Sequence, residues 1–357
     1  MSDFQLHGGD VYRRRGILDF SANINPLGMP EGVREAAVRG VCESEHYPDP
    51  EEEELKQACA KALCVSEDML IPGNGAAELI RIIPEVLCAG GGARGGLIRP
   101  CFGEYETGMR LAGMAIREID FEDAKAGKIP EGLDLVFLGN PSNPDGRSFT
   151  REELTKIAGA NPRTKVIIDE SFLPFVRNEN ERTCIPCLRE YQNMAVIRSF
   201  TKIFAMPGLR LGVLITADDA FGRRVRERLQ PWTVSLPAQR AGVAALSQKS
   251  FVERTVAFLN AERPRMEAEI RGLSFVDRVF PSPANFLLFH VREGQPHRLY
   301  QMLLEKNIQV RDCSSFSGMN RLAFLAGKTG WYRVAVRTRE ENERLIAAMR
   351  EVAAHLS

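Results

Sequence analysis

The chain has 357 residues, 44% of them hydrophobic and 26% charged, so it can form two domains and bury a large core. Lys plus Arg and Asp plus Glu each number 47, which leaves no basic excess for binding a nucleic acid backbone. The N-terminal stretch lacks the apolar region of a signal peptide, and no run of about 18 apolar residues could span a membrane. We therefore expect a cytoplasmic globular protein that binds neither nucleic acid nor membrane.

Short apolar runs alternate with helical patterns from about residue 46 to 245. This alternation predicts an α/β fold, in which a mostly parallel sheet is covered by helices on both faces. The runs expected to form strands are 96–99, 133–139, 165–169, 194–198 and 211–216. We assign residues 46–245 to a large domain of this kind.

The pattern changes beyond Pro237. A charged amphipathic stretch at 250–272 predicts one long helix with a bend at Pro264, and a last helix begins near Arg339. The runs between these helices that are expected to form strands are 285–291, 308–311 and 331–336. We expect a smaller α+β domain built from residues 1–45 and 246–357.

The eight cysteines are scattered along a chain without a secretory signal, so we expect reduced thiols. Cys184 and Cys187 form a single CxxC pair. A structural zinc site would need a second pair or nearby histidines, and neither occurs at a suitable spacing. We therefore expect no metal site.

Glycine-rich and aromatic segments follow the first predicted strands, where open α/β sheets place their ligands. The stretch GNGAAE at 73–78 precedes a helical pattern, and free amides at a helix start bind phosphate. It matches neither the dinucleotide-binding fingerprint nor the Walker A loop, which argues against nicotinamide cofactors and nucleoside triphosphates. Phe102 offers either a stacking platform or a packing ring, and Asn143 belongs to the second of two Asn-Pro pairs in a predicted turn.

Charged residues follow the next strands. Asp169 ends the run 165–169, where a buried carboxylate needs a positive partner such as an arginine or a protonated ring nitrogen. Lys202 lies in Ser199-x-x-Lys202, and Arg210 follows eight residues later. A lysine whose charge is suppressed can bond covalently to an aldehyde cofactor. An anion cradle, an aromatic ring, an aspartate and a lysine are together what a pyridoxal phosphate site requires.

With these motifs, the sequence resembles fold-type-I pyridoxal-phosphate enzymes of the aminotransferase class I/II superfamily, over essentially its whole length. The two nearest families are the threonine-phosphate decarboxylases of cobalamin biosynthesis and the histidinol-phosphate aminotransferases. The motifs that carry both resemblances are Tyr47-Pro-Asp49, Gly73-Asn-Gly75, Asn143-Pro144 with Gly146, Asp169-Glu170, Ser199-x-x-Lys202 and Gly208-Leu-Arg210 with Gly212.

The resemblance implies a role for each matching residue around pyridoxal 5'-phosphate. Lys202 would carry the cofactor covalently, Asp169 would bind its ring nitrogen, Asn143 its phenolic oxygen and Phe102 its ring face. Its phosphate would be held by Gly75, Ala76, Ser199 and Arg210. Tyr47 would reach the cofactor of a neighbouring subunit, which implies a homodimer with shared sites. Arg333 would bind the carboxylate of a small amino acid substrate that carries a phosphate.

Three features bring the sequence closer to the decarboxylases. The opening, His7-Gly8-Gly9 followed by the segment at 18–28, resembles theirs, and Phe172 stands where aminotransferases generally have tyrosine. Arg337 stands where many aminotransferases have glycine, and it is either a second substrate-binding arginine or a surface ion-pair partner. For the substrate's own phosphate, the candidate residues are His7, Gly8, Gly9 and Asn23.

We therefore expect decarboxylation of L-threonine O-3-phosphate to (R)-1-amino-2-propanol O-2-phosphate, with L-serine O-phosphate as an alternative substrate. A histidinol-phosphate aminotransferase that uses 2-oxoglutarate is the alternative within the superfamily. A non-catalytic regulator that binds pyridoxal phosphate is the alternative from another class. The angle at which the substrate carboxylate is held selects between decarboxylation and transamination, and the sequence leaves that angle open.

Overall fold

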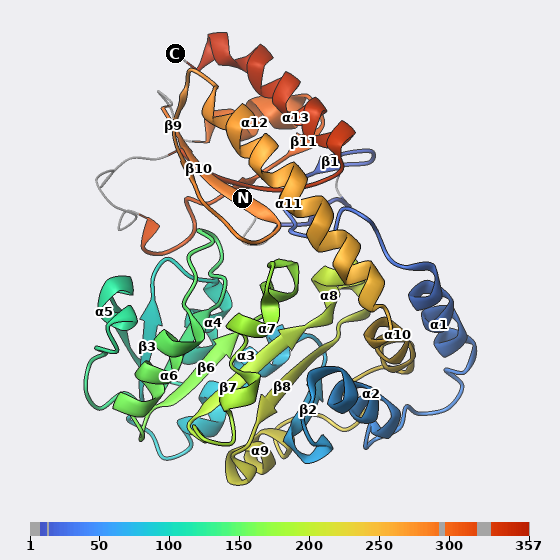
Figure 1. Cartoon of the computed structure of the whole chain (residues 1–357), viewed down its shortest axis with the longest axis vertical. Coiled ribbons are helices and arrows are strands. Elements are labelled where there is room, and N and C mark those ends of the chain that lie inside the picture. Colours follow the sequence, from blue (N-terminus) through green and yellow to red (C-terminus); the bar gives the residue numbers. More distant parts are fainter. Residues whose placement is uncertain (1–7, 13, 293–296, 320–329, 357) are drawn as a thin grey trace.

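The structure is a computed structural model that describes residues 8–12, 14–292, 297–319 and 330–356. A seven-stranded sheet forms the centre of the lower half of the molecule (Figure 1). Its strand order is β2-β8-β7-β6-β5-β3-β4. The strands are β2 (Leu70–Gly73), β3 (Arg94–Ile98), β4 (Ala115–Ile119), β5 (Leu135–Gly139), β6 (Lys165–Asp169), β7 (Met194–Ser199) and β8 (Gly212–Thr216). The α/β class predicted from the sequence is confirmed.

Strands β3 to β7 pair in parallel, whereas β8 runs antiparallel to both of its neighbours, β2 and β7. The chain turns back after β7 through the short helix α8 (Phe200–Ile203) instead of crossing over the sheet, so β8 enters in the opposite direction. The carboxyl ends of β5, β6 and β7 therefore meet at one edge, and Lys202 lies in the turn beside that edge.

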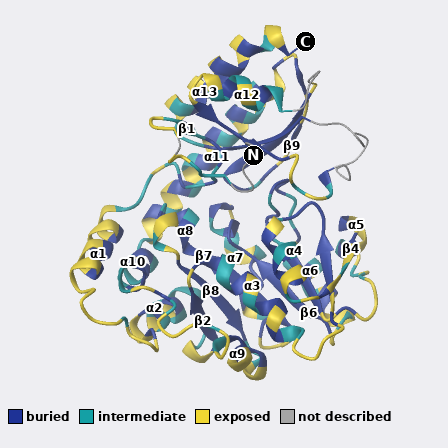
Figure 2. Cartoon of the chain, turned by 180° about the vertical axis from the view of Figure 1, so that it is seen from behind, coloured by how far each residue is buried: buried dark blue, intermediate teal, exposed yellow. Residues whose placement is uncertain are grey.

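Helices cover both faces of this sheet, and all of its strands except the edge strand β4 are largely buried (Figure 2). In α3 (Ala76–Leu87) the buried residues recur at helical spacing, so one stripe packs on the sheet while the helix start points to the strand ends. Further helices of this half include α2 (Glu53–Leu63), α4 (Gly103–Leu111), α5 (Phe121–Lys125), α6 (Arg151–Ala160), α7 (Glu179–Arg182), α8 and α9 (Asp219–Arg226).

The upper half of the molecule in Figure 1 contains a four-stranded antiparallel sheet with the order β12-β13-β10-β9. Its strands are β9 (Val276–Phe280), β10 (Phe286–Val291), β12 (Arg311–Asp312) and β13 (Trp331–Ala335). A parallel pair, β1 (Leu18–Asp19) with β11 (Ile308–Gln309), brings the N-terminal segment beside this sheet. The helices here are α11 (Lys249–Arg271), α12 (Arg298–Glu305) and α13 (Arg339–Val352). Pro264 lies inside α11, which is assigned as a single helix.

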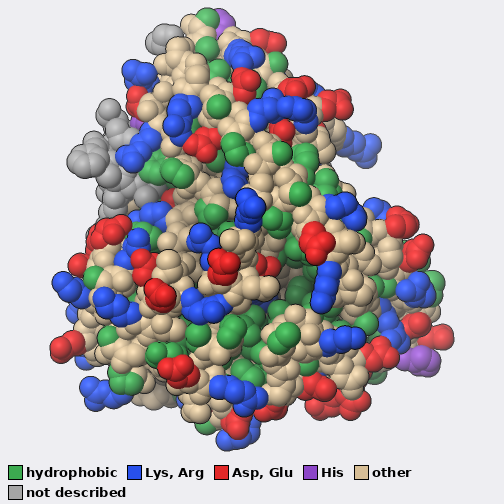
Figure 3. Space-filling model, viewed as in Figure 1, with side chains coloured by type: hydrophobic (Ala, Val, Ile, Leu, Met, Phe, Trp, Pro, Cys, Tyr) green, Lys and Arg blue, Asp and Glu red, His purple; other side chains and the backbone are tan. Residues whose placement is uncertain are grey.

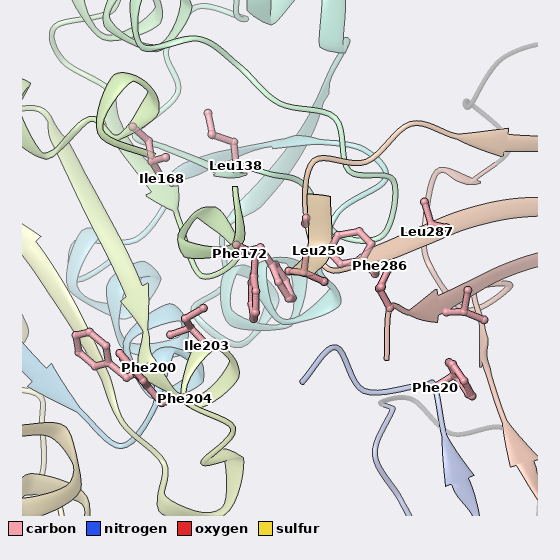
Figure 4. Close-up of a cluster of buried hydrophobic side chains, with 14 of the residues drawn as sticks. Phe20, Leu138, Ile168, Phe172, Phe200, Ile203, Phe204, Leu259, Phe286 and Leu287 are labelled. Atoms are coloured by element: carbon pink, nitrogen blue, oxygen red, sulfur yellow. The ribbon is translucent and has the colours of Figure 1, made fainter. Parts of the chain in front are cut away.

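The two halves share a hydrophobic core. The rings of Phe172 and Phe286 pack edge to face with their centroids 5.1 Å apart, and Figure 4 shows Leu259 of α11 beside them. Helix α1 (Glu31–Cys42), near the N-terminus, packs against α10 (Leu236–Leu246). The domain boundaries predicted from the sequence, 46–245 against 1–45 with 246–357, stay a prediction.

The surface carries charges of both signs side by side, as Figure 3 shows for one face. Within the described residues, none of the helices combines the length and the apolar character that crossing a bilayer would need. All eight cysteines are free thiols.

Candidate active site

Two adjoining cavities lie between the strand ends of the large sheet and the upper half of the molecule. The inner cavity measures about 170 Å³ and the outer one about 660 Å³. The residues that line both are Phe102, Asn143, Phe172, Thr201, Lys202 and Arg210. Four of these six were predicted site residues, so the fold brings together groups that lie more than one hundred positions apart in the sequence.

One end of the inner cavity has the character of an anion site. Ala76 and Ala77, at the start of α3, line it together with Ser199, Thr201 and Arg210. Gly75 precedes the helix with φ of 79°, in the left-handed region that favours glycine. Free amides, two hydroxyls and a guanidinium are donors that suit a phosphate.

Lys202 extends from α8 into both cavities. Burial lowers the pKa of its ammonium group. The carboxylate of Asp169 opposes this shift, while the positive charges of Arg210 and Arg333 lower the pKa further. The Nζ atom lies 5.1 Å from the centroid of the Phe172 ring. An amine with a lowered pKa is uncharged more often, which is the state in which it attacks an aldehyde.

Asp169 ends β6 and is buried against the inner cavity. Its Oδ1 accepts a hydrogen bond from the backbone N–H of Ser171 at 2.9 Å, and its Oδ2 accepts one from the hydroxyl of Tyr105 at 2.7 Å. Each oxygen of this carboxylate therefore accepts one hydrogen bond, which fixes the orientation of the group against the cavity.

Arg333 comes from β13 and lines the outer cavity. It donates hydrogen bonds to the Oδ1 atom of Asn143 and, at 2.6 Å, to the carbonyl of Ser21, so it connects the upper sheet, the loop after β5 and the N-terminal segment. Its Nε atom is buried and has no hydrogen-bond partner among the described residues. Burial, the larger effect, and the nearby positive charge of Arg311 lower its pKa to about 10.

Arg311 is a second buried arginine that lines the outer cavity. It lies opposite Arg333 in the antiparallel pair of β12 and β13, so both side chains project from the same face of the sheet. It donates a hydrogen bond to the hydroxyl of Ser315 at 3.0 Å. Burial lowers the pKa of its guanidinium as well. An anion in the cavity would stabilise both positive charges.

The N-terminal segment closes one side of the outer cavity, which Gly8, Gly9 and Asn23 line as predicted. The backbone N–H of Gly9 donates to the hydroxyl of Ser21 at 2.8 Å. Within the part of the chain that the structure describes, the Oδ1 atom of Asn23 is buried and has no hydrogen-bond partner. His7, also predicted here, lies outside the described residues.

Two predicted residues lie away from the cavities. Arg337 follows β13 and donates to the carbonyl of Asp19 at 3.0 Å and to the carboxylate of Glu341 at 2.8 Å. This placement favours the ion-pair interpretation over substrate binding. Tyr47 is 79% exposed and stacks on Trp232 with centroids 4.5 Å apart, outside the cavities of its own chain.

Sequence reasoning missed Tyr105, Thr201 and Arg311. Tyr105 comes three residues after Phe102, and Thr201 directly precedes the predicted lysine, so both lie close to residues that the sequence pattern singles out. Nothing in the sequence distinguishes Arg311 from the many surface arginines, because its position follows from strand pairing.

The groups that line the inner cavity fit pyridoxal phosphate. They are the anion site, the buried carboxylate of Asp169, the amine of Lys202 and the ring of Phe102. The fold and the site therefore define an enzyme of the pyridoxal-phosphate class. The chain belongs to the aminotransferase class I and II family, whose model matches residues 15–349. The cofactor of this family is pyridoxal 5'-phosphate, as predicted from the sequence.

A threonine-phosphate decarboxylase is more similar to this chain than a histidinol-phosphate aminotransferase is, which is the order that the sequence resemblance gives. The chain is 33% identical to threonine-phosphate decarboxylase of Salmonella typhimurium, over 97% of this chain and 96% of that one. It is 31% identical to histidinol-phosphate aminotransferase of Desulfitobacterium hafniense, over 96% of this chain and 94% of that one. Among solved structures, histidinol-phosphate aminotransferase from Clostridium acetobutylicum matches with a TM-score of 0.85 and 27% identity, over 95% of this chain and 100% of that one.

Proposed function

We propose that this chain decarboxylates L-threonine O-3-phosphate to (R)-1-amino-2-propanol O-2-phosphate, a linker for the nucleotide loop of cobalamin. The observation that carries the proposal is the pair of buried guanidiniums, Arg311 and Arg333, side by side in the cavity that Lys202 enters. Threonine phosphate bears a carboxylate and a phosphate on neighbouring carbons, which suits two adjacent cations. Histidinol phosphate has a phosphate but no carboxylate, so it would match only one of these cations; of the two substrates of the alternative enzyme, only the dicarboxylate 2-oxoglutarate would match both.

Each residue has a defined task in this reaction. Arg333 would bind the substrate carboxylate through its two-pronged guanidinium and set the angle of that group. Arg311 would bind the substrate phosphate, with Asn23 and the N-terminal backbone completing that end of the cavity. When bound, pyridoxal phosphate supplies the electron sink for the electron pair left at Cα. Lys202 Nζ would then return a proton to Cα, a transfer that its lowered pKa makes easier near neutral pH.

We further propose that two chains form a homodimer with shared sites. Tyr47 points to solvent, stacked on Trp232, and does not line the cavities of its own chain. An exposed aromatic pair of this kind is typical of an interface. The partner subunit's Tyr47 would bind the cofactor phosphate beside Arg210.

Substrate turnover tests the proposal directly. Purified protein with pyridoxal phosphate and L-threonine O-3-phosphate should release CO2 and the amino-propanol phosphate without any 2-oxo acid, and free L-threonine should react far more slowly. L-serine O-phosphate should be a weaker substrate, because one methyl group contributes only about 1–3 kcal/mol of discrimination. Conversion of histidinol phosphate that depends strictly on 2-oxoglutarate, without CO2 release, would overturn the proposal. A change in visible absorbance without any product would favour a regulator.

A further inference from the structure

Tyr105 is a buried residue of the inner cavity that the sequence motifs did not identify. It lies in the first turn of α4, and its hydroxyl donates to the Oδ2 atom of Asp169 at 2.7 Å. The other carboxylate oxygen accepts the Ser171 N–H, so donors contact Asp169 on both of its oxygens. Tyr105 therefore contributes the only side-chain hydrogen bond recorded for this carboxylate within the described part of the chain.

The phenol ring is fixed from both sides. It lies parallel to the ring of Phe137, with centroids 5.1 Å apart and an interplanar angle of 6°, and it meets Phe102 edge to face at 5.7 Å. A Cβ atom at Gly139 would come within 3.3 Å of the Tyr105 hydroxyl, so glycine at the end of β5 leaves room for it. Tyr105 thus contacts both Phe102 and Asp169, the residues expected to support the face and the nitrogen of the cofactor ring.

The hydroxyl stays protonated in this setting. Burial, the charge of Asp169 and the hydrogen bond to it together raise the pKa of Tyr105 well above its usual value. A phenol that keeps its proton is a permanent donor. A donor to a carboxylate favours the ionised form of that carboxylate.

We propose that Tyr105 is a positioning residue that acts through Asp169: its hydroxyl holds the carboxylate in the orientation in which it would face the ring nitrogen of the cofactor. The inference rests on the cofactor role of Asp169 in the proposed function, and it adds a residue that the sequence motifs did not identify.

A double-mutant cycle on cofactor binding tests this inference without using turnover. Tyr105→Phe keeps the ring and its stacking but removes the hydroxyl, and we expect the apoenzyme to bind pyridoxal phosphate about tenfold more weakly in equilibrium dialysis. In an Asp169→Asn background, the same substitution should change the affinity by less than about twofold, because the charged acceptor is already gone. The pH dependence of the visible absorbance of the bound cofactor should shift in Tyr105→Phe.

Tyr191→Phe is the matched control, since it removes a phenol hydroxyl outside the cavities and should leave the affinity and the absorbance unchanged. An equal loss of affinity in both backgrounds would mean that Tyr105 acts only through packing, and no loss at all would equally overturn the inference. If Asp169→Asn itself leaves the affinity unchanged, the cofactor role of Asp169 fails, and the inference fails with it. If Asp169→Asn weakens cofactor binding but the cycle shows no coupling with Tyr105→Phe, only the inference about Tyr105 fails and the cofactor role of Asp169 stands.

Discussion

A Cβ atom built on Gly75 would lie 2.5 Å from the Nη2 atom of Arg210. The two residues come from opposite sides of the anion site, Gly75 from the turn before α3 and Arg210 from the segment before β8. Both have positive φ, 79° and 59° respectively. The guanidinium therefore reaches the cavity across a space that only glycine leaves open.

Replacing Gly75 tests this close approach. Gly75→Ala should displace Arg210 and weaken binding of pyridoxal phosphate by about tenfold or more, while backbone strain costs about 1–2 kcal/mol of stability. Gly28→Ala is the matched control, because Gly28 has φ of 75° but no atom within 4 Å of its added Cβ. It should share the loss of stability in thermal melts and bind the cofactor normally. Equal affinity in both variants would contradict the phosphate role of Arg210.

Lys202→Ala should fold like the wild type and lose turnover completely, since the amine that carries the cofactor is gone. Circular dichroism and thermal melts check the fold. Reduction of the wild-type holoenzyme with borohydride, followed by peptide mapping, should place the cofactor label on Lys202. A label on any other lysine would rule out the assignment.

Arg333→Met should raise KM for threonine phosphate about 100-fold or more, because truncating one partner of a buried charged pair typically costs 2–5 kcal/mol. In the wild type, KM should rise as the pH passes about 10, since the lowered pKa of Arg333 removes its positive charge there instead of near 12.5. Arg265→Met, a partly exposed arginine that pairs with Glu262, is the control. Steady-state kinetics across pH give both results, and a flat KM up to pH 11 would speak against this role.

Mixing two inactive variants tests the shared site. Lys202→Ala and Tyr47→Ala should each be inactive, yet a hybrid dimer contains one site that lacks both residues and one that is intact. Unfolding and refolding an equal mixture should then restore about a quarter of the wild-type sites. Activity assays with size-exclusion chromatography measure this, and a mixture that stays inactive while forming hybrid dimers would exclude the shared arrangement.

The buried ion pair between Arg198 and Glu170, next to Asp169 in the sequence, should contribute to the stability of the fold. Arg198 Nη2 lies 2.7 Å from the carboxylate of Glu170, which also accepts hydrogen bonds from Thr183 and from the backbone of Cys184. Arg198→Met should cost about 3–5 kcal/mol, because it leaves a buried carboxylate unpaired. Burial raises the pKa of Glu170, so folding of this variant should weaken as rising pH ionises the unpaired group. Denaturant unfolding at two pH values checks this, and Glu170→Gln in the same chain should recover part of the loss.

Secondary structure could be predicted where burial leaves a simple pattern. The runs at 165–169 and 194–198 have no charge inside them except at their ends, and they form β6 and β7 almost residue for residue. The missed strands have a physical reason as well. β2 reads Leu-Ile-Pro-Gly, which resembles a turn, and β4 lies at the sheet edge, where only Ile119 of its five residues is buried.

Sequence reasoning anticipated which residues lie together where chemistry and local chain geometry coincide. Asp169, Ser199 and Lys202 each stand at or next to the end of a buried strand, and parallel strands deliver such positions to one edge of the sheet. Arg337 shows the limit of that reasoning, because β13 ends at Ala335 and the capping of α13 turns the Arg337 side chain toward Glu341.

The sequence by itself determined the fold class and the cofactor and singled out Lys202 as a candidate, because these follow from residue types at fixed spacings along one chain segment. Only the tertiary structure decided that Arg311 stands beside Arg333 and that Tyr105 meets Asp169. Those pairs depend on strand register and on the packing of helices against a sheet, which long-range burial fixes and no local pattern records.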